Sequence, residues 1–106
     1  MKVLIVVCNV PGEALAQQMA AVLVGEGLAA CVNILPACQS VYRWEGRIET
    51  ASEVPLLIKT TASQYEGLQA RIQALHPYDV PEIMAVAAEC GLPAYLGWVQ
   101  ASVAGA

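Results

Sequence analysis

The sequence predicts an α+β fold: an antiparallel sheet of four strands, two helices on one of its faces, and a short C-terminal helix. Three observations lead to this prediction. Strand-like and helix-like hydrophobic patterns follow one another in the order β-α-β-β-α-β. Two long β-rich segments meet at one tight turn. The chain has 106 residues, enough for one core but not for two, so residues 1–106 should form a single domain.

The first strand and the first helix are predicted over residues 2–25. Lys2–Val10 is a nearly continuous run of Val, Ile and Leu, which is typical of a strand covered on both faces. A Pro-Gly pair ends this strand. From Glu13 the apolar residues recur with the i, i+4, i+7, i+8 spacing of one helical face, and Gly25 ends the helix. The residues on that face are Leu15, Met19, Val22 and Leu23.

A long β-hairpin is predicted next, with arms at Leu28–Tyr42 and Arg47–Thr60 and with Gly46 supplying the positive φ of a tight turn. Arms of this length extend beyond what a small sheet backed by two helices can cover, so we expect the overhang to contact a neighbouring subunit. The overhang carries Tyr42, Arg43 and Trp44. Pro36 and Pro55 cannot donate to a strand ladder, which predicts bulges or edges at these positions.

The remaining elements complete the predicted order. Ser63–Glu66 has the sequence of a capping box, and the helix that follows should end at His76-Pro77. Glu82–Ala88 is a predicted strand and Ala94–Val103 a predicted helix. The helical spacing after the box comes from Tyr65, Leu68, Ile72 and Leu75. This order is the split βαβ, or ferredoxin-like, arrangement, in which one sheet face stays uncovered.

The composition predicts an oligomer. Hydrophobic residues make up 58% of the chain and charged residues only 13%, against roughly 25% charged residues in an average globular domain. Because the chain has too little polar surface to cover itself, its apolar strands should be buried against other copies. The net charge is −4 and the five basic residues are scattered, so nucleic acid is not an expected partner. A membrane is not expected either, because no segment approaches the roughly 18 apolar residues of a membrane span.

The start of the chain imitates a secretory signal only weakly, because the unbroken apolar run covers just Val3–Cys8. Cleavage at the imitated site after Ala16 would remove the first strand. We therefore expect Met1 to be retained and the protein to be cytosolic. Four cysteines without a C-x-x-C spacing are expected to be reduced thiols in that compartment.

One pair of residues could bind a metal ion. If the last strand lies antiparallel beside the first, Cys8 should meet the turn from His76 to Glu82 at one edge of the sheet. A thiolate beside an imidazole suits copper, above all Cu(I), or zinc. Two ligands suffice for two-coordinate Cu(I), whereas zinc would need Asp79, Glu82 or a neighbouring subunit to complete its shell.

Each of these residues also has a purely structural interpretation. Cys8 could simply pack in the core, and His76 could cap the C-terminus of the helix. The other three cysteines, Cys31, Cys38 and Cys90, are expected in the core. An enzyme is not predicted: the sequence shows no third group to orient a Cys-His nucleophile pair, and no glycine-rich loop precedes Lys59.

Several segments together resemble the CutA divalent-cation-tolerance family. They are ACVNILP (30–36), SVYRWEGRIE (40–49), EVPLLIKTT (53–61), HPYDVPEI (76–83) and YLGWV (95–99). The resemblance extends from about Val3 to Val103 and is carried by the order and spacing of all five segments.

The resemblance implies a cytoplasmic homotrimer, similar to the PII signalling proteins, that binds copper and other divalent cations in the response to metal ions. It places the copper ligands on Cys8 and His76, and this chain has Leu75 where some members carry a second histidine. A cleft between subunits is implied as well. Its candidate lining residues are Lys59, His76, Tyr78 and Glu82. The alternative is a trimeric small-molecule sensor or signalling module with its ligand in that cleft.

Overall fold

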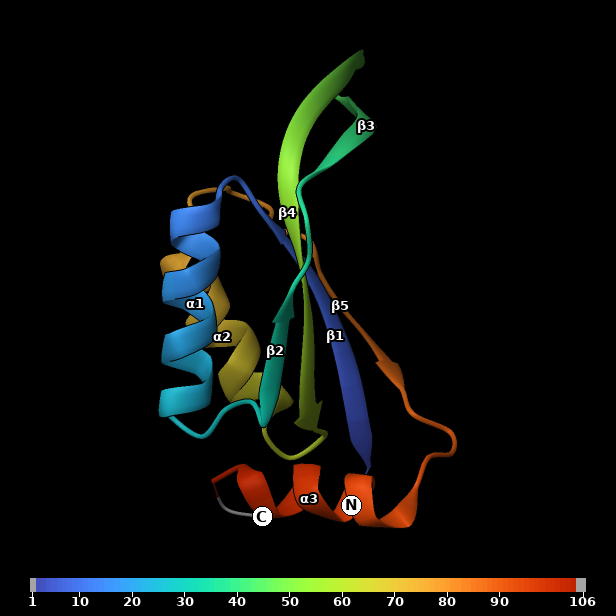
Figure 1. The fold of residues 1–106 in the computed structure, drawn as a ribbon. Helices are drawn as coiled ribbons and strands as arrows, with labels where there is room; N and C mark the ends of the chain where they lie inside the picture. Colours follow the sequence, from blue (N-terminus) through green and yellow to red (C-terminus); the bar gives the residue numbers. More distant parts are fainter. Residues whose placement is uncertain (1, 105–106) are drawn as a thin grey trace.

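The fold is an antiparallel sheet with two helices on one face and a third helix across its end (Figure 1). The computed structural model describes residues 2–104, so the predicted retention of Met1 concerns a residue outside this range. The elements are β1 (Val3–Val10), α1 (Glu13–Gly25), β2 (Cys31–Ile34), β3 (Cys38–Trp44), β4 (Arg47–Thr61), α2 (Tyr65–Leu75), β5 (Ile83–Ala87) and α3 (Pro93–Ser102). The α+β class and the antiparallel sheet predicted from the sequence are confirmed.

The sheet is organised around β4, the longest strand. Its strand order is β2-β4-β1-β5, and β3 pairs with the other half of β4. The β3–β4 hairpin therefore projects beyond the helices, as Figure 1 shows, and the described residues extend over 44 × 25 × 23 Å. At the hairpin tip, Glu45 (φ 50°) and Gly46 (φ 78°) both have positive φ, which is the geometry of a two-residue hairpin turn.

The first hairpin arm is not one strand but two. β2 ends at Ile34, opposite Leu56, whereas β3 begins at Cys38, opposite Glu53. The two registers differ by one residue, so the segment that contains Pro36 holds an extra residue, as in a β-bulge. The prediction that Pro36 marks a bulge is confirmed, whereas Pro55 lies within β4 and is paired with Asn9 of β1. The prediction of a four-stranded sheet with one continuous arm is wrong.

The ends of α2 differ in how well the sequence predicts them. Its N-cap is Gln64, which makes no side-chain cap hydrogen bond and lies one residue after Ser63, the first residue of the predicted capping box. The C-terminal prediction is confirmed. His76 has extended backbone geometry (φ −81°, ψ 135°), as a residue before proline should, and its N–H donates to the carbonyl of Ile72 at 2.8 Å.

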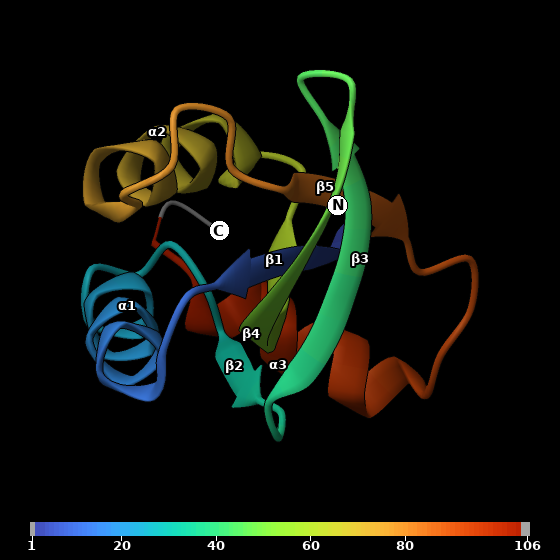
Figure 2. The same ribbon diagram turned by 90° about the horizontal axis from the view of Figure 1, so that it is seen from above.

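The core lies between the sheet and the pair α1 and α2, which Figure 2 shows on the same side. Alternate residues of β1 point into it, and these include Cys8. The buried residues of this core are Val6, Cys8, Val10, Ala16, Met19, Leu23, Ala29, Val54, Leu56, Ile58, Leu68 and Ile72. On the opposite sheet face, Met84 and Val86 of β5 are 58% and 55% exposed. Within residues 2–104, no helix is long and apolar enough to cross a membrane.

Candidate functional site

The end of β1 and the end of α2 meet at one backbone carbonyl, that of Asn9. His76 Nε2 lies 2.7 Å from this oxygen, and Cys8 Sγ lies 3.9 Å from it. Cys8 is fully buried, His76 is only 7% exposed, and Cys8 is paired with Ile83 at the start of β5. The antiparallel pairing of the first and last strands therefore brings Cys8 and His76 to one place, as expected from the topology.

The hydrogen bonds of His76 define its tautomer. Its Nδ1 accepts the backbone N–H of Tyr78 at 3.2 Å, so the ring hydrogen is on Nε2 and is donated to the Asn9 carbonyl. The Tyr78 ring packs against the imidazole with the ring centroids 4.7 Å apart. Both ring nitrogens are thus engaged, and neither presents an unused lone pair.

Cys8 is held as a neutral thiol. Burial, which is the largest cause, and the negative charges of Glu82 and Glu53 together raise its pKa from 9.0 to about 12. Metal ions bind the thiolate rather than the thiol. In the part of the chain that the structure describes, no three His, Cys, Asp or Glu side chains are grouped so as to hold a metal ion. In this arrangement, Cys8 and His76 do not form a ready metal site.

A second polar group surrounds the side chain of Asn9, which points to the other sheet face. Asn9 Nδ2 donates to Glu53 Oε1 at 3.5 Å and to Glu82 Oε1 at 3.3 Å. The Tyr78 hydroxyl donates to Glu53 Oε2 at 3.3 Å, and burial together with Glu53 raises the Tyr78 pKa. Glu53 is only 8% exposed. Sequence reasoning missed it, although a lone carboxylate directly before the apolar run of β4 is the kind of signal that marks a buried acid.

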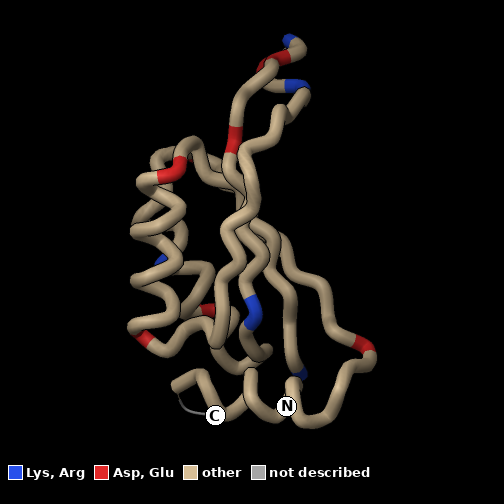
Figure 3. Tube along the Cα trace, viewed as in Figure 1, with Lys and Arg blue, Asp and Glu red and all other residues tan. Residues whose placement is uncertain are grey.

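These residues line a hollow of about 600 Å³ between the hairpin and segment 78–82. Its walls combine aromatic rings with carboxylates. The lining residues are Asn9, Ser40, Val41, Tyr42, Trp44, Glu53, Tyr78, Asp79, Val80 and Glu82. None of these described lining residues is Lys or Arg. In Figure 3, an acidic segment lies at the base of the hairpin, whereas basic and acidic segments lie together at its tip.

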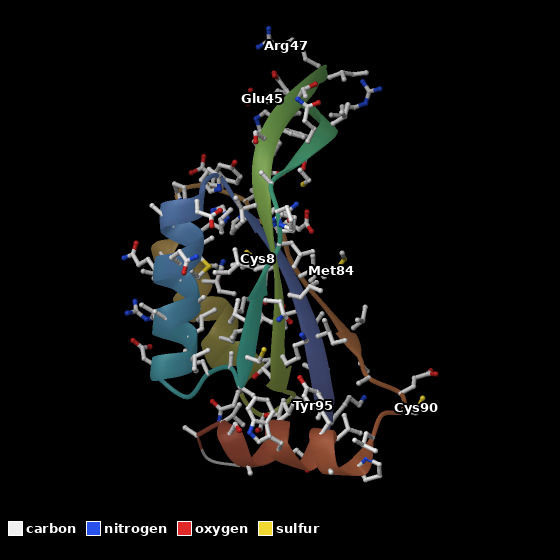
Figure 4. All side chains as sticks on the ribbon, in the orientation of Figure 1. Cys8, Glu45, Arg47, Met84, Cys90 and Tyr95 are labelled. Carbon is white, nitrogen blue, oxygen red and sulfur yellow. The ribbon has the colours of Figure 1, made fainter. Side chains whose placement is uncertain are left out.

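The other candidate residues lie elsewhere. Lys59 is on β4 opposite Cys31 and Ile5, where its Nζ donates to Asn33 Oδ1; it is not part of the hollow, unlike Tyr78 and Glu82. The second and third cysteines of the chain are half-buried on β2 and β3. The prediction that Cys90 is in the core is wrong. It is exposed in the loop between β5 and α3, where Figure 4 labels it, because that loop extends away from the sheet.

Comparison with known proteins gives consistent matches over nearly the whole chain. Residues 4–102 match the family model described as CutA1 divalent ion tolerance protein. The divalent-cation tolerance protein CutA of Thermus thermophilus is 46% identical over 96 residues, 91% of this chain and 93% of that protein.

Solved structures give the same result. CutA1 from Oryza sativa superimposes with a TM-score of 0.96 at 38% identity, covering 100% of this chain and 97% of that chain. A protein named as the periplasmic divalent cation tolerance protein CutA from Archaeoglobus fulgidus has a TM-score of 0.91 at 32% identity, covering 94% and 97%.

Proposed function

Because the chain belongs to the CutA1 divalent ion tolerance family, we propose that it acts in divalent-cation tolerance as a cytoplasmic homotrimer that binds ligands and is not an enzyme. The relatives are named for tolerance of divalent cations, and this supports a role in the response to metal ions. The structural observation that supports the assembly is the uncovered apolar face of the sheet.

The trimer is supported by two exposed apolar surfaces. One is the open sheet face with Met84 and Val86, and the other lies on the projecting hairpin, where Val41 and Ile48 are 68% and 69% exposed. A monomer would leave both in water, whereas packing against other copies would bury them. The strand order β2-β4-β1-β5 with two helices on one face also supports a ferredoxin-like core assembled in the manner of the PII proteins.

Light scattering at micromolar concentration tests the trimer. The expected mass is three times that of the 11.2 kDa chain. A stable, folded monomer under these conditions would contradict the proposal.

Cys8 and His76 are proposed as the side chains that bind copper. The supporting observation is that both side chains approach the same carbonyl, that of Asn9. Their donor atoms suit Cu(I), although the thiol is neutral and both imidazole nitrogens are hydrogen-bonded. Copper uptake would therefore require loss of the thiol proton and rearrangement around His76, and the pair is not proposed as the site of a resident metal.

Competition with a chelator for Cu(I) tests whether these two side chains bind copper. Cys8→Ser and His76→Ala should each weaken binding, and Cys31→Ser and Cys38→Ser should leave it unchanged. Equal affinity in the wild type and in both single variants, with the assembly intact, would assign His76 a purely structural role as the capping residue of α2.

A small-molecule sensor is the second candidate, and the hollow of about 600 Å³ beside the hairpin favours it. In a trimer, this hollow would lie next to the overhang that is proposed to contact a neighbouring subunit. A thermal-shift panel is the test. A ligand present at 100 times its Kd should add about 2.7 kcal/mol of stability per site, and unrelated compounds should add nothing.

The compartment is proposed from the sequence rather than from the relatives. One structural relative is named as periplasmic, so the cytoplasmic assignment needs its own measurement. Fractionation of cells that produce the untagged protein should recover it with the cytoplasmic markers. Recovery with the periplasmic fraction would overturn the assignment.

A further inference from the structure

We propose that the hollow beside the hairpin binds a small organic cation, that is, a primary amine or a guanidinium group carried on an apolar body. This inference names the ligand class for the second candidate function above and rests on it. It depends on the charge, the aromatic walls and the hydrogen bonds of the hollow.

The first argument is charge. Glu53, Asp79 and Glu82 all line the hollow, and its described lining contains no basic residue. Glu53 is almost completely buried, yet its hydrogen-bond partners are neutral groups, the amide of Asn9 and the hydroxyl of Tyr78. A buried carboxylate with no opposite charge is costly. A cationic ligand would supply the missing charge.

The second argument is that aromatic side chains form the remaining walls of the hollow. Tyr42 and Trp44 line the hollow from the hairpin and Tyr78 lines it from the facing segment, and all three side chains are exposed in the described chain. Aromatic faces attract organic cations and also cover apolar ligand surface. A cavity of about 600 Å³ is within the range of small-molecule sites.

The third argument concerns a metal ion in the same place. The Asn9 amide nitrogen lies between the two carboxylates and donates to both Glu53 and Glu82. An N–H donor there opposes an inorganic cation bridging these two groups. An ammonium or guanidinium group avoids the conflict, because it can donate to carboxylate oxygens from the side of the hollow.

A second copy of the chain is a weaker candidate for the occupant. The hairpin tip reaches furthest from the body of the protein and carries Arg43 and Arg47, but it also carries Glu45 and Glu49. The tip is therefore neutral in net charge and offers no complement to an acidic hollow. Figure 4 shows Glu45 and Arg47 close together at this tip.

Isothermal titration of the full chain tests the inference with three probes that share one apolar body. Phenethylamine is the cation, 2-phenylethanol is neutral and phenylacetate is the anion. We expect phenethylamine to bind once per chain and the other two compounds to show no binding. Glu53→Gln, which preserves shape but removes the charge, should weaken phenethylamine at least about tenfold, the usual effect of losing a charge-assisted hydrogen bond.

Matched variants keep the test decisive. Glu49→Gln changes a carboxylate on the same strand that does not line the hollow, so the affinity should be unchanged. Asp79→Asn should weaken binding several-fold and serves if Glu53→Gln fails to fold. Trp44→Leu should weaken binding by about two- to fivefold through loss of the cation–π contact.

Three results would overturn the inference. The first is equal binding of the cation and the anion. The second is an unchanged affinity for phenethylamine in both Glu53→Gln and Asp79→Asn. The third is binding of Mn²⁺ at the hollow carboxylates without binding of the amine. Absence of binding together with a changed oligomeric state in the hollow variants would show instead that a second copy fills the hollow. Light scattering and Cu(I) competition are measured in parallel, so failure of amine binding is separable from failure of the trimer or the copper proposal.

Discussion

Alkaline pH should destabilise the protein through Cys8, and by an amount that the structure defines. The Cys8 pKa is about 12 in the folded chain, against 9.0 for an ordinary thiol. Between these values the unfolded chain has released the proton and the folded chain still holds it, so stability falls as pH rises. Each pH unit in this window removes about 1.4 kcal/mol, so roughly 2 kcal/mol is lost by about pH 10.5.

Replacing the thiol isolates this effect. Cys8→Ala leaves a small cavity that costs about 1 kcal/mol near neutral pH, but the variant has no thiol to titrate. The wild type should therefore be the more stable protein at pH 8 and the less stable one at about pH 10.5. Tyr78 also has a raised pKa, but it is present in both proteins and its contribution cancels in the comparison.

Urea unfolding from pH 8 to pH 11 measures this reversal, with a reducing agent and without added metal. One protomer concentration is used throughout, because the proposed assembly would contribute to stability. Cys90→Ser is the matched control, since Cys90 is exposed, and its curve should follow the wild type. Parallel pH profiles for the wild type and Cys8→Ala would refute the reasoning that burial holds this thiol neutral.

Three further predictions concern the cap, the turn and the open face. His76→Ala should cost about 1–3 kcal/mol in urea unfolding, because the buried Asn9 carbonyl loses its donor; an unchanged midpoint would contradict this. Gly46→Ala should cost about 1 kcal/mol, because its φ of 78° is unfavourable for a residue with a Cβ; Gly12→Ala, at extended φ, is the control. Met84→Lys should lower the average mass measured by light scattering below that of the proposed trimer, whereas Glu66→Lys on α2 should leave the measured mass unchanged.

The sequence predicts the elements of this fold well where one local signal dominates. β1 and α1 match their predicted bounds to within one residue, because a β-branched run and a helical repeat are separated by a Pro-Gly pair. Pro77 ends α2 because the residue before a proline is confined to extended geometry. The start of α2 is predicted less closely, because its N-cap is Gln64, one residue after Ser63.

The candidate site is harder to predict because it depends on what side chains do after they have been brought together. Topology alone places Cys8 near His76. Whether the imidazole offers a lone pair depends on the Tyr78 amide and the Asn9 carbonyl, and neither backbone group has a signature in the sequence. Glu53 is missed for a similar reason, since its burial depends on the base of the hairpin lying beside segment 78–82.

The one-residue difference in register between β2 and β3 has a consequence for how this chain can vary. The register of β2 is tied to the core, whereas the register of β3 is tied to the turn at the hairpin tip, and the segment around Pro36 absorbs the difference. The registers of the arm and of the core are thus set separately, although β4 continues through both. Matched insertions beyond the Trp44–Arg47 pair would lengthen the arm while preserving the register of the residues that line the hollow. The length of the arm can therefore change without a change in the strand register of the core.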